Sequence, residues 1–122
     1  MVTFSKSLIH GHTTAPVKHR FVRGDRPVAD FTVAVNDSFK RGDEWIETTS
    51  YIDITCFGTL ADAVKELPVG SGVYCEGRLS SETWDDKSTG RRRFRLKVIA
   101  ERLRRTPSKA ESNEEPKEAA KS

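Results

Sequence analysis

Hydrophobic and polar residues alternate along most of the chain up to Leu103, and this period of two is that of a β-strand with one buried side. The segments 27–36 (PVADFTVAVN) and 48–57 (TTSYIDITCF) show the alternation most clearly. The second segment is also rich in β-branched and aromatic residues, which fit a pleated, half-buried surface. We therefore predict two strands, whose apolar sides consist of Ala29, Phe31, Val33, Val35, Ile52, Ile54 and Cys56.

Three further strands and one helix complete the predicted elements. Thr3–His10 is the first strand, and Gly72–Trp84 and Arg91–Leu103 are the arms of a long hairpin around the turn-rich sequence DDKSTG. Leu60–Leu67 is the predicted helix, because its apolar residues recur at the spacing i, i+3, i+4 and i+7. Proline and glycine residues directly after this segment are expected to end the helix.

Five strands with a short helix between the third and the fourth are the order of elements in the oligonucleotide-binding fold (OB-fold), a Greek-key barrel. The predicted fold class is therefore all-β. A chain of 122 residues has room for one such domain, which we assign to residues 1–105. Residues 106–122 have no aromatic and almost no apolar side chain except alanine. Because they cannot bury enough surface to offset the entropy of ordering, we expect this tail to be disordered.

The charge of the chain favours a polyanionic partner only weakly. The net charge is +3 and the pI is about 9.0, and because the tail has three Lys against four Glu, residues 1–105 carry +4. Ordinary solvation of the surface explains this charge equally well. No apolar run approaches the roughly 18 residues that span a bilayer, and no secretory signal is visible. We expect a cytoplasmic protein without membrane association.

No catalytic, cofactor or metal site is apparent in the sequence. The glycines are scattered, and none forms a loop with the spacing that cradles a phosphate group. His10 and His12 share one side of a strand, but no third ligand lies at a spacing that predicts a metal site. Cys56 and Cys75 follow the apolar parity of their strands, so we expect buried, reduced thiols, with a disulfide as the alternative. A binding protein without a cofactor is favoured over an enzyme.

Aromatic residues occur where a core does not require them. Tyr51 and Phe57 share the polar side of one predicted strand, while Phe39 follows another strand and Trp84 lies near the tip of the hairpin. Each of these aromatic residues, taken alone, is compatible with packing beneath a loop. Together they favour an exposed platform on which the bases of a single-stranded nucleic acid stack. The predicted stacking residues are Phe39, Tyr51, Phe57 and Trp84.

Basic residues are interleaved with these aromatics. In the returning arm of the hairpin they occupy one parity, while Phe94, Leu96 and Val98 occupy the other. A run of charge is usually a solvated face, but a basic stripe along one side of a strand suits contact with a phosphate backbone. The predicted phosphate-contacting residues are Lys18, Arg20, Lys40, Arg41, Arg78, Arg91, Arg93, Arg95 and Lys97.

Three segments carry the pattern of a known family: 26–40 (RPVADFTVAVNDSFK), 57–64 (FGTLADAV) and 70–84 (GSGVYCEGRLSSETW). Over residues 8–105 the chain closely resembles the bacterial single-stranded DNA-binding protein family. The resemblance implies an OB-fold, usually a homotetramer, that binds single-stranded DNA without sequence preference in DNA replication, recombination and repair, on the nucleoid of the cytoplasm. The four predicted stacking residues match the family's stacking positions, whereas Trp45 matches none.

The chain also departs from that family. Its cytoplasmic members typically end in a short acidic tip with Pro-Phe that recruits partner enzymes. This chain ends in KEAAKS, so we expect DNA binding to be retained and recruitment of repair or replication enzymes to be reduced. Ser80, Ser81 and Glu82 stand where the family often has basic residues. These differences favour an accessory paralogue, or a plasmid or phage version. The alternatives are a primosome adaptor, which four stacking aromatics disfavour, and a cold-shock-type RNA-binding barrel, which would cluster its aromatics in a shorter chain.

Overall fold

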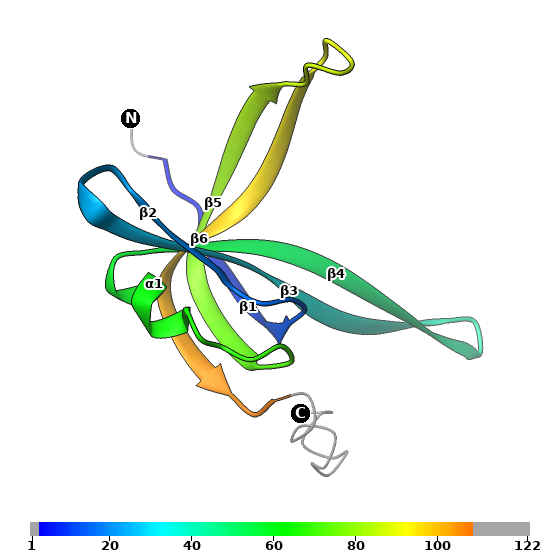
Figure 1. Cartoon of the computed structure of the whole chain (residues 1–122). Helices are drawn as coiled ribbons and strands as arrows, with labels where there is room; N and C mark the ends of the chain where they lie inside the picture. The colour runs from blue at the N-terminus through cyan, green and yellow to red at the C-terminus, as the bar shows by residue number, and fades with distance from the viewer. Residues whose placement is uncertain (1–2, 109–122) are drawn as a thin grey trace.

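A computed structural model describes residues 3–108, which form six strands, one short α-helix and one 3-10 turn (Figure 1). In chain order the elements are β1 (Ser7–Thr13), β2 (Lys18–Val22), η1 (Arg23–Asp25), β3 (Arg26–Arg41), β4 (Glu44–Phe57), α1 (Thr59–Val64), β5 (Gly72–Asp85) and β6 (Arg92–Thr106).

Five of these strands close into a barrel. Hydrogen bonds join them in the order β1-β5-β6-β4-β3, and the pairs His12↔Ala34 and Thr13↔Val33 join β1 to β3. The β4–β6 pair is parallel and the other pairs are antiparallel. The helix lies between the third and the fourth barrel strands in chain order. The predicted all-β OB-fold is confirmed.

The structure differs from the prediction in the bounds of the first strand, Ser7–Thr13 rather than Thr3–His10, and in one additional strand. The polar stretch that follows the first strand contains this additional strand, β2. β2 pairs only with the first residues of β3 and has no fully buried side chain. Because alternation is a signal of burial on one side, a strand with so little burial leaves only a weak pattern in the sequence.

The barrel interior contains the apolar parity that the sequence predicts. Ala29, Val33 and Cys56 are fully buried, and Phe31 and Ile54 are nearly so. Val35 and Ile52 pack against this core at its edge. Burying such side chains is the main stabilising contribution, at about 1.5–3 kcal/mol for each large aliphatic or aromatic residue.

The helix α1 packs on β3, β4 and β6 and buries Ala61 and Val64. It is shorter than the predicted helix, which extends to Leu67. The Leu67 amide donates to the carbonyl of Val64 (3.1 Å), so the chain turns there while the side chain of Leu67 stays in the core. Pro68 prevents the helix from continuing past Leu67, because the residue before a proline is disfavoured in the α conformation.

Two long hairpins extend outward from the barrel (Figure 1). The β3–β4 hairpin pairs as far as Arg41↔Glu44, beyond the predicted ends at residues 36 and 48, and turns at Gly42 with φ of +64°. The β5–β6 hairpin, which the sequence predicts well, changes register at Glu76/Gly77. A Cβ on Gly77 would lie 2.2 Å from the carbonyl oxygen of Ile99, so only glycine permits this close approach.

Cys56 and Cys75 are free thiols with no exposed surface, as their parity predicts. Residues 109–122, which hold most of the tail expected to be disordered, lie outside the described residues. Thr106 does not belong to such a tail, because it ends β6 and its hydroxyl lies 2.9 Å from Nε2 of His10.

Candidate nucleic-acid interface

The outer side of the barrel carries a polar groove. The β3–β4 register pairs Thr32 with Asp53 and Asp30 with Thr55, and the pleat directs these side chains away from the core. Side chains of β2 border the groove on one flank and those of the β5–β6 hairpin on the other. The groove is lined by Ala15, Pro16, Lys18, Arg20, Asp30, Phe31, Thr32, Asp53, Ile54, Thr55, Glu82, Arg95 and Lys97.

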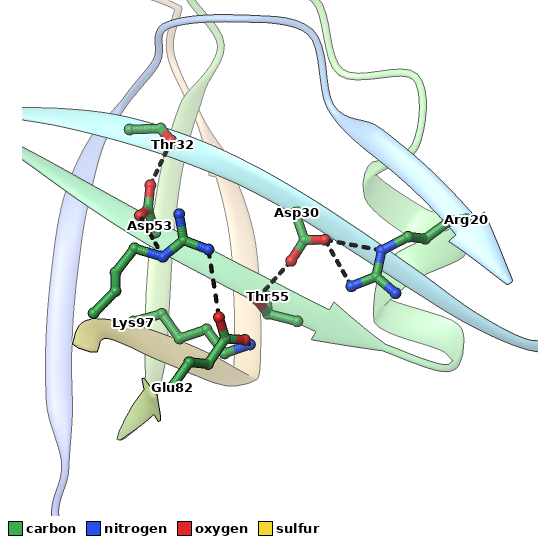
Figure 2. A network of polar contacts seen from close by, with 8 residues as sticks. Arg20, Asp30, Thr32, Asp53, Thr55, Glu82 and Lys97 are labelled. Carbon is green, nitrogen blue, oxygen red and sulfur yellow. Dashed lines mark hydrogen bonds and ion pairs between the residues drawn. The ribbon is translucent and has the colours of Figure 1, made fainter. Parts of the chain in front are cut away.

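On the β2 flank an arginine is held by a carboxylate (Figure 2). Nε and Nη2 of Arg20 donate to Oδ2 of Asp30, at 3.3 and 3.1 Å. The other oxygen of Asp30 accepts a hydrogen bond from the hydroxyl of Thr55 (2.7 Å). Thr55 itself is 2% exposed, so this bond connects the surface pair to the sheet beneath it. The guanidinium of Arg20 is thereby fixed at the rim of the groove.

On the hairpin flank two cations share two carboxylates (Figure 2). Arg95 lies 3.8 Å from Asp53 and 3.4 Å from Glu82, and Lys97 donates to the same Glu82. The hydroxyl of Thr32 donates to Asp53 (2.7 Å). The hydrogen bond from Lys97 is the largest cause that lowers the pKa of Glu82, and Arg95 lowers it further. Glu82 is therefore ionised at neutral pH and neutralises part of the basic stripe.

The groove is close to charge balance. It has four cations and three carboxylates, and Lys18 is the only one of the four cations that forms no ion pair within residues 3–108. Lys18, Arg20, Arg95 and Lys97 are all predicted phosphate contacts, so the structure does bring four of the nine together. The carboxylates among them were not part of that prediction. They were missed because Asp30, Asp53 and Glu82 lie far apart in sequence and meet only through strand pairing.

Exposed aromatic side chains flank this groove. Tyr51 on β4 is 68% exposed and Trp84 on β5 is 43% exposed. The guanidinium of Arg95 lies 5.9 Å from the ring centroid of Trp84, which places the basic stripe beside this ring. Phe57 at the end of β4 is half-buried, and the Arg26 guanidinium lies 4.6 Å from its ring centroid. Tyr51 and Phe57 share the outer side of β4, as the sequence predicts.

Phe39 does not lie on that side. Strand pairing sets Phe39 opposite Ile46 and Lys40 opposite Trp45, and the parity of the ladder puts Lys40 and Trp45 on the side of Tyr51. Trp45, 67% exposed, was assigned no role from the sequence. Its position follows from the register of the hairpin, whose two strands pair as far as Arg41↔Glu44. Phe39, 47% exposed, faces the reverse side.

The remaining predicted cations are spread over the hairpins. Lys40 and Arg41 are exposed near the β3–β4 turn, and Arg78 is exposed on β5, outside the groove. Arg93 pairs across the ladder with Trp84, and Nη1 of Arg93 donates to Asp86 (3.2 Å). Arg91 directly precedes β6. None of these five residues lines the groove.

Residues 3–108 contain no group of three His, Cys, Asp or Glu side chains that could hold a metal ion. The rings of His10 and His12 lie 6.0 Å apart, centroid to centroid. In the same part of the chain no helix is long and apolar enough to cross a membrane.

Residues 4–106 match the model of the Single-strand binding protein family. The Single-stranded DNA-binding protein of Helicobacter hepaticus is 34% identical over 93% of this chain and 67% of its own length. That of Borreliella burgdorferi is 27% identical over 84% of this chain and 70% of its own length. A solved structure, the Plasmodium falciparum SSB complex with ssDNA, has a TM-score of 0.78 at 20% identity and covers 87% of this chain and 97% of its own. This structural similarity supports the OB-fold of the chain. The family match and these relatives show that this chain belongs to the single-strand binding protein family.

Proposed function

We propose that this chain binds single-stranded DNA without sequence preference, by stacking of bases on aromatic side chains and contact of phosphates with Lys and Arg. The observation that carries the proposal is the outer side of the barrel, where exposed Tyr51 and Trp84 flank a groove that contains four cations. Family membership and relatives named as single-stranded DNA-binding proteins support it. Stacking tolerates any base, because every base has a π face.

The proposed contacts divide into two kinds. Bases stack on Tyr51, Phe57 and Trp84, with Trp45 continuing the same side of the β3–β4 hairpin and Phe39 available on its reverse. Phosphates contact the nine predicted cations. Those held by carboxylates in the groove exchange a carboxylate for a phosphate when DNA binds, so we expect a moderate affinity with a marked dependence on salt.

We further propose that the protein acts as a homotetramer. The strand β1 pairs with β5 along its length but with β3 only at His12 and Thr13, so the other edge of residues 7–11 has no strand partner in the described chain. An unpaired edge presents backbone donors and acceptors that a second copy can satisfy. The resemblance to the bacterial family supports a tetramer as the final assembly.

The cellular role that we propose is protection of single-stranded DNA during replication, recombination and repair, on the nucleoid in the cytoplasm. The role is one of binding and not of catalysis, in line with a family described by what it binds.

Fluorescence titration tests the proposal. Oligothymidine should quench the tryptophan fluorescence, whereas the matching duplex should bind far more weakly. Trp84→Ala and Phe57→Ala should each weaken binding by about fivefold or more, because a stacked base contributes roughly 1–3 kcal/mol. Val69→Ala, at an exposed position that does not line the groove, serves as the control. Equal affinity of both aromatic variants and the parent would contradict the stacking assignment, and stronger binding to duplex would contradict the proposed function.

A further inference from the structure

The β5–β6 hairpin has a second exposed side. From Leu79 and Lys97 to the turn, β5 and β6 pair only with each other. Near the turn, each face of this ribbon has an exposed aromatic side chain, Trp84 on one and Phe94 on the other. The pair Trp84↔Arg93 lies on the face that borders the groove. The next pair, Thr83↔Phe94, lies on the reverse face, because side chains alternate along a strand.

Phe94 is the most exposed large hydrophobic residue of this reverse face, with 70% of its surface accessible. Its parity is the one that fills the core at Val98, and in the sequence it reads as part of the core. The hairpin carries Phe94 past the end of the barrel, where no core faces it. An aromatic ring so exposed on a charged ribbon has no packing role in the described chain.

Arginines surround this ring. Phe94, Arg91, Arg92 and Arg93 line a shallow hollow together with Thr89. The guanidinium of Arg91 forms no hydrogen bond or ion pair with residues 3–108, while its backbone amide donates to Thr89 (3.3 Å). Arg92 lies 3.9 Å from Asp85 and donates to the hydroxyl of Thr83 (3.5 Å), but both contacts are exposed, so water weakens them. Unlike most cations of the groove, two of these three arginines are available to a phosphate.

The turn beside the hollow is held in one conformation. The Asp86 carboxylate accepts hydrogen bonds from the amide and the hydroxyl of Ser88, at 2.9 and 2.7 Å, and from Arg93. The Asp86 amide donates to the carbonyl of Arg91 (2.8 Å), which closes the hairpin. Because the backbone around Arg91 is ordered before any ligand arrives, binding there costs little conformational entropy.

We propose that Phe94, with Arg91 and Arg92, forms a further subsite for single-stranded DNA on the reverse face of the β5–β6 hairpin. One base stacks on Phe94 while the adjoining phosphates contact the two guanidinium groups. The hairpin is only two strands wide, with about 4.8 Å between the strand axes. A DNA strand that leaves Trp84 on one face can therefore pass around the edge of the hairpin and reach Phe94 on the other face. The inference rests on the proposed function and extends the bound path from one face of the hairpin to both.

A tryptophan reporter tests the subsite directly. In the variant W45F/W84F/F94W the residue at position 94 is the single tryptophan, and in W45F it is Trp84. We expect short oligothymidines to quench Trp84 alone, and longer ones to quench both reporters. Quenching of Trp84 without quenching at position 94 at any length would overturn the subsite and leave the proposed function standing. Quenching of neither would contradict the proposed function.

Substitutions test the contribution of the subsite to binding. Phe94→Ala should weaken binding to a long oligonucleotide by about fivefold or more, the range of one lost stacking contact. Leu96→Ala, on the same face but farther from the arginines, should leave the affinity unchanged. R91A/R92A should reduce the log–log salt slope by roughly 0.7 for each lost phosphate contact. Unchanged DNA binding by F94A with altered sedimentation of the free protein would overturn the subsite and assign Phe94 to an interface between protein chains.

Discussion

At the scale of single residues, Glu82 has the largest influence on the charge of the groove. Its carboxylate contacts both Arg95 and Lys97, and the guanidinium of Arg95 lies beside the ring of Trp84. A phosphate that approaches these cations therefore competes with a carboxylate of the protein itself. We therefore expect Glu82 to lower the affinity for DNA while it holds both cations in place.

Glu82→Gln should strengthen binding to single-stranded DNA by up to about fivefold, because each exposed ion pair that no longer competes is worth roughly 0.2–1 kcal/mol. Glu101→Gln removes the same charge from an exposed site outside the groove and serves as the matched control. Fluorescence titration at one fixed salt concentration compares the variants. An equal increase in DNA affinity in both variants would mean that the net charge alone, and not competition within the groove, sets the affinity.

Protonation of Glu82 should have the same effect as Glu82→Gln. The hydrogen bond from Lys97 lowers the pKa of Glu82, so the carboxylate persists until the pH falls below the usual range of a glutamate. As the pH falls through that lowered pKa, Lys97 and Arg95 are released to phosphates and the DNA affinity of the parent should rise. The rise should be smaller in Glu82→Gln. Identical pH profiles for the two proteins would show that Glu82 does not control the groove cations.

At the scale of elements, the sequence predicts the strands well where they line the barrel and poorly where they leave it. Segments 27–36 and 48–57 alternate because one side of each faces the core. Residues 37–47 pair just as regularly, but both sides of that ribbon face solvent and select no pattern. For this reason the side on which Phe39 and Trp45 lie could not be predicted, while Tyr51 and Phe57 could be assigned to the outer side.

The β3–β4 hairpin provides a comparison of its two faces. Trp45→Ala should weaken binding to single-stranded DNA by about fivefold or more, since Trp45 shares the side of Tyr51 and stacking contributes roughly 1–3 kcal/mol per base. Phe39→Ala, on the reverse side, should weaken this binding by a smaller factor. Anisotropy of a labelled oligothymidine measures both without relying on tryptophan fluorescence. A larger loss in Phe39→Ala would mean that DNA follows the other face of this hairpin.

At the scale of the whole molecule, the ionisation of the two buried thiols makes the stability of the fold depend on pH. Desolvation is the main cause that raises the pKa of Cys56 to about 12 and that of Cys75 to about 11. A thiol with a raised pKa in the fold stabilises it below the ordinary value of 9.0, and this contribution is lost as the pH rises toward the folded values. Tm should therefore fall between pH 9 and 11 more steeply in the parent than in C56A/C75A. An equal decrease in Tm in the parent and in C56A/C75A would show that the thiols have the same pKa in the folded and unfolded states.

The assembly of the molecule should depend on the free edge of β1. Leu8 is 63% exposed on this strand, whose backbone edge at residues 7–11 has no partner in the described chain. Leu8→Lys places a charge on the edge, a substitution that disfavours strand pairing between copies. We expect a lower sedimentation coefficient for this variant and unchanged affinity for a short oligonucleotide.

Binding to long DNA should be affected differently. When linked subunits engage one strand, the second contact benefits from a high effective concentration, so loss of assembly should weaken binding to a long oligonucleotide by up to about a hundredfold. Phe21→Lys is the matched control, because Phe21 is 64% exposed but lies on β2, away from that edge. If Leu8→Lys sediments like the parent while Phe21→Lys dissociates, the subunits associate through β2 rather than through the edge of β1.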